Sequence, residues 1–196
     1  MKRFYKEATA QAADNGWTVH LDGKPIRTPA KTPFLAPERV AKAAAAEWEA
    51  QVEVVKPSEM PITRAVNSAI DRTAPEFDAV VDMVAAYGGT DLICYRADGP
   101  AELVRRQLET WTPLIAWAES RFGARLLTAT GVMHVLQPED GQVKLAQAVR
   151  EYDPLALTAL YDLVALSGSL IIGLAVAENH LSVAEGWAAS RVDETW

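Results

Sequence analysis

The character of the chain changes at Pro37, and this change constrains the fold more than any other feature of the sequence. The residues before it form short extended runs, such as Trp17–Leu21, separated by the turn pairs Asn15-Gly16 and Asp22-Gly23. An Asp-Gly pair between two extended runs is a strong hairpin signal. After Pro37, apolar residues recur every three or four positions, which is typical of amphipathic helices. We therefore predict an α+β protein, with a small β-rich N-terminal domain at residues 1–36 and a larger, mainly helical domain at residues 37–196.

Helix-ending residues divide the helical part into segments. Pro57 ends the first helix, and Ser58 is expected to cap the second. Ala101–Phe122 is predicted to be one long helix that ends at Gly123. Residues 125–135 are expected to be extended. Four further helices are expected at residues 139–152, 154–166 and 169–180 and from residue 182 to the terminus.

The longest apolar run, residues 155–177, contains a single charged residue, Asp162. Its length is enough to cross a bilayer, which takes about 20 residues. However, Ser167-Gly168-Ser169 interrupts the run, and a carboxylate is costly in lipid. We therefore expect two buried helices that meet near the Ser-Gly-Ser sequence, and no stable membrane insertion. The basic N-terminus lacks the apolar segment of a secretory signal.

Charge and cysteine content exclude several classes of function. The chain has 196 residues and a formal net charge of −7, whereas nucleic-acid-binding domains usually carry a basic surface. Its single cysteine, Cys94, excludes an internal disulfide and a zinc site of the multi-cysteine type. The three histidines lie far apart in the sequence. We expect no metal, no cofactor and no nucleic-acid partner.

Sequence motifs for catalysis are missing. There is no Gly-rich phosphate loop, nucleophile elbow or H-E-x-x-H pair. The neighbours of Cys94 are apolar, which favours a buried thiol over a nucleophile. A small cofactor-free enzyme that uses Cys94 and a histidine in a cleft between the two domains remains the alternative function. The carboxylates Glu47, Glu49 and Glu53 are expected to lie on a solvated helix face.

The stretch Met60–Arg72 contains the one group of polar residues whose regular spacing suggests a binding site. Arg64, Asn67 and Asp71 follow one another at spacings of three and four residues, which places them on one face of a helix. Such a face is either a polar seam between helices or a recognition surface whose amide and guanidinium groups bond a protein partner. The profile as a whole fits protein binding better than catalysis.

Six stretches together resemble the assembly-chaperone family of the F1-ATPase, specifically the member that acts on the alpha subunit. They occur in the family's order and extend over nearly the whole chain: Arg3–Lys6, Val19–Pro29, Ala46–Gln51, Met60–Arg72, Asp91–Arg96 and Leu166–Leu174.

The resemblance implies a small β-containing domain followed by an orthogonal helical bundle. It also implies a chaperone without cofactor or chemical step, which covers the surface that alpha presents to beta. The family occurs in alpha-proteobacteria and mitochondria, so a bacterial cytoplasm is expected, or the mitochondrial matrix if the source is eukaryotic. The family's chain continues past Asp193–Trp196 into an acidic segment. The partner-binding residues that we expect are Arg64, Asn67, Asp71, Tyr95, Arg96 and Glu194.

Overall fold

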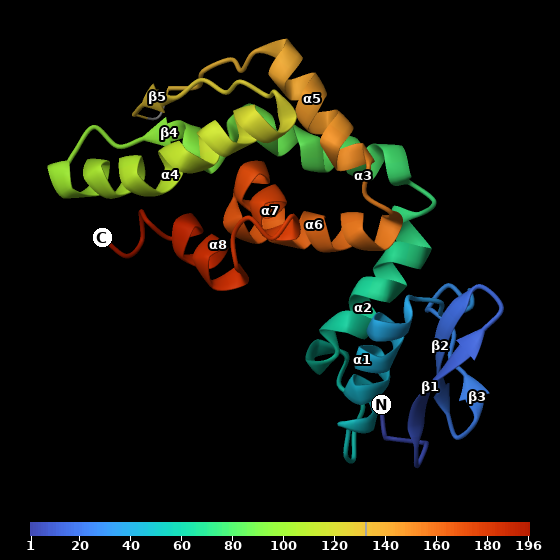
Figure 1. Cartoon of the computed structure of the whole chain (residues 1–196). Helices are drawn as coiled ribbons and strands as arrows, with labels where there is room; N and C mark the ends of the chain where they lie inside the picture. Colours follow the sequence, from blue (N-terminus) through green and yellow to red (C-terminus); the bar gives the residue numbers. More distant parts are fainter. Residues whose placement is uncertain (132) are drawn as a thin grey trace. The chain divides into compact units, whose positions relative to one another are not determined.

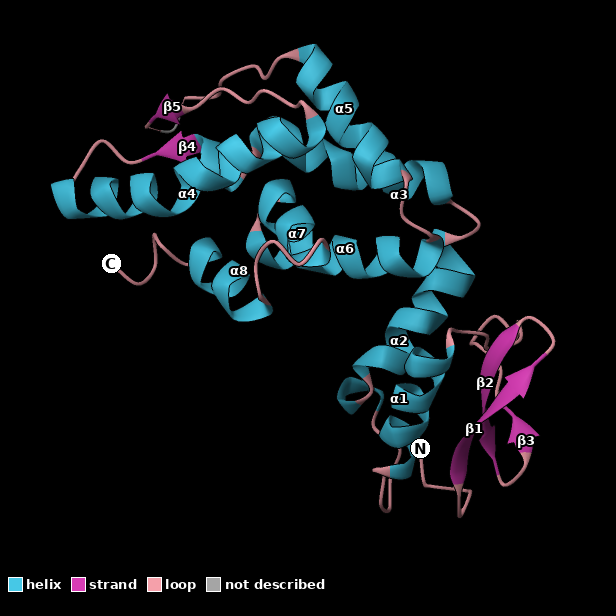
Figure 2. Ribbon diagram, viewed as in Figure 1, coloured by secondary structure: helices cyan, strands magenta, loops and turns pink. Residues whose placement is uncertain are grey.

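The computed structural model describes residues 1–131 and 133–196 and has the predicted α+β class (Figure 1). A three-stranded sheet near the N-terminus is followed by a mainly helical region (Figure 2). Contacts divide the chain into two compact units, Met1–Phe77 and Asp78–Trp196. The first unit includes two helices as well as the sheet, and a domain boundary after residue 36 stays a prediction. Val132, in the segment expected to be extended, lies outside the described residues.

The sheet of the first unit is an antiparallel meander of β1 (Ala8–Ala13), β2 (Gly16–Leu21) and β3 (Lys24–Pro25). The predicted hairpin turn is present between β2 and β3, and both of its residues have positive φ angles, 48° at Asp22 and 79° at Gly23. These angles suit a right-twisted hairpin. The third strand is short, because proline cannot donate to a strand ladder.

Helix α1 (Glu38–Glu49) contacts β1 and β2 and forms the core of the first unit with them. The buried face of α1 consists of three alanines, which let the helix approach the sheet closely. The main apolar residues that fill this core are Tyr5, Val19, Leu21 and Phe34.

Helix α2 (Pro61–Ser68) is capped by a side chain from α1 rather than by Ser58. The Glu47 carboxylate accepts hydrogen bonds from the backbone N–H groups of Ile62 and Thr63, at 2.6 and 2.8 Å, and from the Thr63 hydroxyl at 2.8 Å. A carboxylate at a helix N-terminus satisfies orphan N–H groups and interacts favourably with the helix dipole. The predictions of a Ser58 cap and of a solvated Glu47 are therefore wrong.

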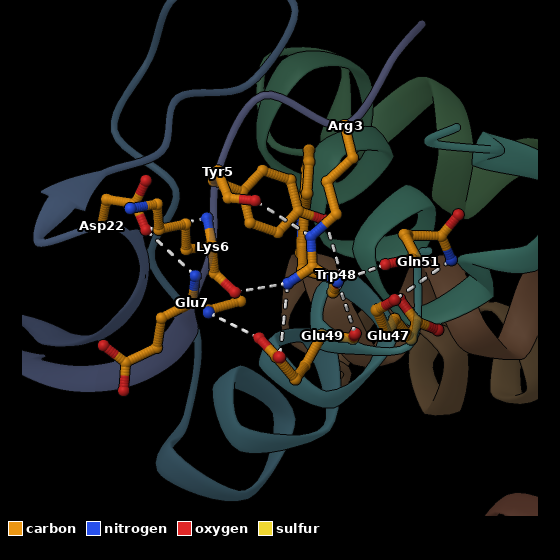
Figure 3. A network of polar contacts seen from close by, with 10 residues as sticks. Arg3, Tyr5, Lys6, Glu7, Asp22, Glu47, Trp48, Glu49 and Gln51 are labelled. Carbon is orange, nitrogen blue, oxygen red and sulfur yellow. Dashed lines mark hydrogen bonds and ion pairs between the residues drawn. The ribbon is translucent and has the colours of Figure 1, made fainter. Parts of the chain in front are cut away.

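A cluster of polar contacts joins the N-terminal segment to the end of α1 (Figure 3). The Arg3 guanidinium donates to the backbone carbonyls of Tyr5, Lys6, Glu49 and Gln51 and forms an ion pair with Glu49. Carbonyls in the last turn of a helix have no intrahelical partner, so Arg3 satisfies groups that would otherwise need water.

The second unit is built from α3 (Phe77–Ala86), α4 (Ala101–Phe122), α5 (Glu139–Arg150), α6 (Pro154–Ser167), α7 (Leu170–Ala177) and α8 (Val183–Ser190). Two short strands, β4 (Tyr95–Arg96) and β5 (Ala129–Thr130), pair in parallel. Helix α4 has the predicted bounds, and Gly123 ends it with a φ angle of 68°. Helix α8 ends at Ser190 instead of continuing to the terminus, which corrects the prediction.

Helix α7 is the centre of the second unit, with Leu170–Ala175 entirely buried. Its N-terminus is held by Ser169 and by the buried carboxylate of Asp91, which accepts the Ile171 N–H at 3.0 Å. A Cβ added at Gly173 would lie 2.5 Å from Val164 Cγ2, so this glycine permits close packing of α6 on α7. The apolar run thus forms two helices, as predicted. None of the described helices is both long and apolar enough to cross a membrane.

Candidate partner-binding surfaces

The first unit contains a pocket of about 830 Å³, here called the Arg64 pocket. One wall is formed by the exposed side of α2, and the other walls come from the turn after β3 and from the end of α1. Its lining consists of Met1, Arg27, Thr28, Pro29, Ala30, Trp48, Val55, Pro57, Met60, Thr63, Arg64, Asn67, Ser68, Asp71 and Arg72. Three of the six residues expected to bind a partner, Arg64, Asn67 and Asp71, therefore line the same pocket.

Asp71 belongs to a polar seam inside the unit. Its carboxylate accepts the Thr28 hydroxyl at 2.6 Å and the Ala30 N–H at 2.9 Å. It lies in a π-helical segment, Ala69–Thr73, that continues α2. Such segments are often found at functional sites. Both oxygens of Asp71 thus hold the turn that forms one wall of the pocket.

Two residues that line the pocket each carry a polar atom that is buried without a hydrogen-bond partner among the described residues. These atoms are the indole nitrogen Nε1 of Trp48 and the amide oxygen Oδ1 of Asn67. The indole N–H is a donor and the amide oxygen is an acceptor. Two residues of the lining therefore carry one unused donor and one unused acceptor.

The rim of the Arg64 pocket is positively charged, although the chain as a whole carries a net charge of −7. Arg27, Arg64 and Arg72 are exposed, and Asp71 is the one carboxylate in the lining. Within residues 1–131 and 133–196, Arg64 and Arg72 form no ion pair. These two guanidinium groups are available to an anionic partner.

Tyr95 and Arg96 lie on β4 in the second unit and do not line this pocket. Arg96 is buried, donates to the Gln107 carbonyl at 2.7 Å and lies 5.2 Å from the centre of the Trp111 ring. Burial lowers the pKa of Arg96. The half-buried Tyr95 places its hydroxyl 3.1 Å from His134 Nδ1. Arg96 thus supports the core, whereas Tyr95 is accessible in part.

Glu194 lies beside an apolar surface of the second unit. Its carboxylate pairs with Arg191 at 2.6 Å, and the Arg191 guanidinium lies 4.2 Å from the centre of the Trp187 ring. Leu166, Val183 and Trp187 are 67%, 71% and 55% exposed and border one apolar hollow of about 120 Å³. We call these three residues the Trp187 patch. Exposed apolar surface of this kind is a common mark of protein interfaces.

The geometry around Cys94 does not suit a nucleophile. The thiol is fully buried, and burial raises the pKa of Cys94 to about 12. Nucleophilic cysteines need an accessible thiolate. Within the described part of the chain, no group of three or more His, Cys, Asp or Glu side chains is arranged to hold a metal ion.

Sequence reasoning missed Trp48 and Arg72 as site residues. Trp48 lies on α1 and lines the pocket beside residues of α2, although the two helices are separate in the sequence. No periodic pattern signals such a contact. Arg72 is the last residue of the Met60–Arg72 stretch, and its positive charge could have marked it as a candidate for binding a partner.

Comparisons with known proteins define the class of protein. Two structures of Atp12 from Paracoccus denitrificans, one of them a point mutant, each have 47% sequence identity and a TM-score of 0.94. Each match covers 98% of this chain and 83% of the other. The Agrobacterium tumefaciens protein Atu1473, described as a candidate chaperone, has 44% identity and a TM-score of 0.95, with 100% of this chain and 74% of the other covered. Proteins of this fold and sequence are thus described as chaperones.

The particular family follows from the sequence match. The ATP12 chaperone protein family matches residues 2–119, which is more than half of the chain. This chain belongs to the ATP12 chaperone family, which confirms the family resemblance inferred from the sequence.

Proposed function

We propose that this chain is an assembly chaperone of the F1-ATPase that binds the unassembled alpha subunit and covers the surface that alpha presents to beta. The observation that carries the proposal is the membership of the ATP12 chaperone family, together with the close match to Atp12 over nearly the whole chain. The family resemblance supplies the identity of the alpha subunit as client. The proposed place of action is the bacterial cytoplasm.

The mechanism has no chemical step. A subunit that lacks its neighbours exposes apolar surface and self-associates, and a chaperone on that surface prevents this. Release requires that the final alpha–beta contact be more favourable than the chaperone contact, because displacement depends on the difference between the two affinities.

Two surfaces support a role in protein binding. The Trp187 patch offers apolar contact, and Glu194 holds the arginine that lies over Trp187. The Arg64 pocket offers charge and hydrogen bonds, and we propose that Arg64 and Asn67 contact the client while Asp71 contributes to the interface by holding the turn that forms one wall of the pocket. For Tyr95 and Arg96, on β4, we propose a supporting role at the client interface.

A pull-down with separately expressed alpha and beta subunits tests the proposal. The immobilised chain should retain alpha and not beta, and Trp187→Ser should reduce the retention of alpha. Arg39→Glu serves as the charge-change control, because Arg39 is exposed and outside both surfaces. Failure of the unchanged chain to retain alpha, with circular dichroism showing a folded protein, would overturn the proposal.

A further inference from the structure

We propose that the Arg64 pocket binds an extended acidic segment of the client protein. Trp48 and Asn67 would bond the peptide backbone of this segment, and Arg64 and Arg72 would bond its carboxylate side chains. The identity of the client rests on the proposed function, whereas the chemistry of the segment is argued from the pocket alone.

The unpartnered polar atoms are the first argument. Leaving a buried donor or acceptor unsatisfied is unfavourable, and more than about 90% of buried polar groups in native proteins have a partner. Here two such atoms, Trp48 Nε1 and Asn67 Oδ1, belong to residues that line the same pocket. A ligand that bonds both removes both costs at once.

The pairing of donor and acceptor identifies the kind of ligand. A peptide unit carries one N–H donor and one C=O acceptor. Its carbonyl fits the indole N–H of Trp48, and its N–H fits the amide oxygen of Asn67. A simple anion such as sulfate offers acceptors alone and would leave Asn67 Oδ1 without a partner. The pair therefore favours a peptide backbone over a free inorganic anion.

The charges identify the side chains of the segment. Arg64 and Arg72 form no ion pair with any described carboxylate, and both oxygens of Asp71 are already occupied by Thr28 and Ala30. An arginine fork binds a carboxylate through two parallel hydrogen bonds. Asp or Glu side chains on the ligand would form ion pairs with Arg64 and Arg72. These two arginines make a local positive site on a protein whose net charge is negative.

Size and wall composition fit a short segment. The volume of about 830 Å³ lies within the range of roughly 300–1,000 Å³ that is usual for ligand pockets. Met60 and Val55 are 2% and 5% exposed and, with two prolines, provide an apolar wall. The pocket thus fits a few extended residues in which an apolar side chain lies close to an acidic one.

The test uses the full chain and fluorescein-labelled peptides, tiled along the alpha subunit at roughly 12 residues each, as suits recognition of short segments. Binding is measured by fluorescence polarisation. We expect the peptides that bind to be acidic, and the same peptides with Asn and Gln in place of Asp and Glu to bind at least about tenfold more weakly. Binding should also weaken with added salt.

Variants of the chain test whether the peptide binds in the Arg64 pocket. Arg64→Glu and Arg72→Glu should each weaken binding at least about tenfold. Trp48→Phe keeps an aromatic ring but removes the N–H group, and it should weaken binding about fivefold, as expected for one lost hydrogen bond. Arg39→Glu is the matched control and should leave affinity within about twofold, because exposed charges at a distance are screened.

Three results would overturn the pocket proposal. They are equal binding of the acidic and amidated peptides, unchanged binding by folded Arg64→Glu and Trp48→Phe, and binding of inorganic sulfate in the absence of any peptide binding.

The pull-down separates the pocket proposal from the proposed function. Retention of alpha without peptide binding would overturn the pocket alone. Acidic peptides held in the pocket without retention of alpha would support the pocket and overturn the proposed function.

Discussion

The buried carboxylate of Asp91 should make the stability of this protein depend on pH, and Asp91→Asn should remove that dependence. Asp91 is fully buried, and burial raises its pKa from the ordinary 3.8 to about 6, although Ser169 and the backbone N–H groups of Ile93 and Ile171 oppose the shift. The folded state therefore holds a proton at pH values where the unfolded chain has lost it.

The sign and size follow from proton linkage. Where the folded state binds more protons than the unfolded state, the free energy of unfolding decreases as pH rises. The difference between 3.8 and about 6 corresponds to about 3 kcal/mol at roughly 1.36 kcal/mol per pH unit. Between about pH 4.5 and 7.5, the part that can be measured is about 2 kcal/mol. Above that range the contribution is constant.

The assay is urea unfolding followed by tryptophan fluorescence, at several pH values, for the unchanged chain and for Asp91→Asn. The variant also loses one acceptor for a backbone N–H group, which adds an offset that does not depend on pH. The difference in unfolding free energy between the two proteins should therefore fall by about 2 kcal/mol from about pH 4.5 to 7.5. Asp98→Asn, at an exposed position nearby, controls for the loss of one carboxylate. A difference that stays constant across this range would refute the reasoning.

Three further substitutions test individual contacts. Glu47→Gln removes the charge from the cap of α2 and should lower the free energy of unfolding in urea by about 1–2 kcal/mol; an equal loss for the exposed Glu53→Gln would contradict the capping role. Gly173→Ala should cost about 1–3 kcal/mol in the same assay, because the added Cβ would press on α6. Gly89→Ala, whose site has room for a Cβ, is its control, and a gain in stability for Gly173→Ala would show that the two helices are not closely packed. Arg3→Lys keeps the charge but loses the fork that bonds four carbonyls, so the melting temperature should fall by about 3–8 °C; an unchanged melting temperature would mean that these bonds are dispensable.

Local features of the sequence predicted local features of the fold. The bounds of Ala101–Phe122 and the hairpin at Asp22-Gly23 were predicted correctly, because periodicity and turn residues act over short distances along the chain. The Ser167-Gly168-Ser169 break correctly divided the apolar run into two helices. The bounds of the first strand, Ala8–Ala13, are not marked in the sequence in the same way, since β1 alternates weakly and is positioned by its pairing with β2.

Contacts between distant residues were beyond sequence reasoning. Glu47 was expected in solvent, but its carboxylate bonds N–H groups 15 and 16 residues further along, a relation that leaves no periodic pattern. In the same way, the spacing of Arg64, Asn67 and Asp71 predicted a shared face, whereas the contribution of Trp48 to the same pocket depends on how α1 packs in the first unit. The polar-seam interpretation describes Asp71, and the unused groups of Arg64 and Asn67 fit the recognition surface.

The contacts of Arg3 have a consequence for the order of events during synthesis. The carbonyls of Glu49 and Gln51 that Arg3 bonds lie 46 and 48 residues later in the chain, so Arg3 is translated before they are. The Arg3 contacts therefore cannot form until α1 has left the ribosome. Only then can the chain between Arg3 and α1 close into a loop, at the usual cost in conformational entropy. None of these contacts requires residues after Phe77, and domains generally fold as units in the order in which they are made. The Arg64 pocket, whose lining lies within the same residues, can thus be complete while the second unit is still being translated.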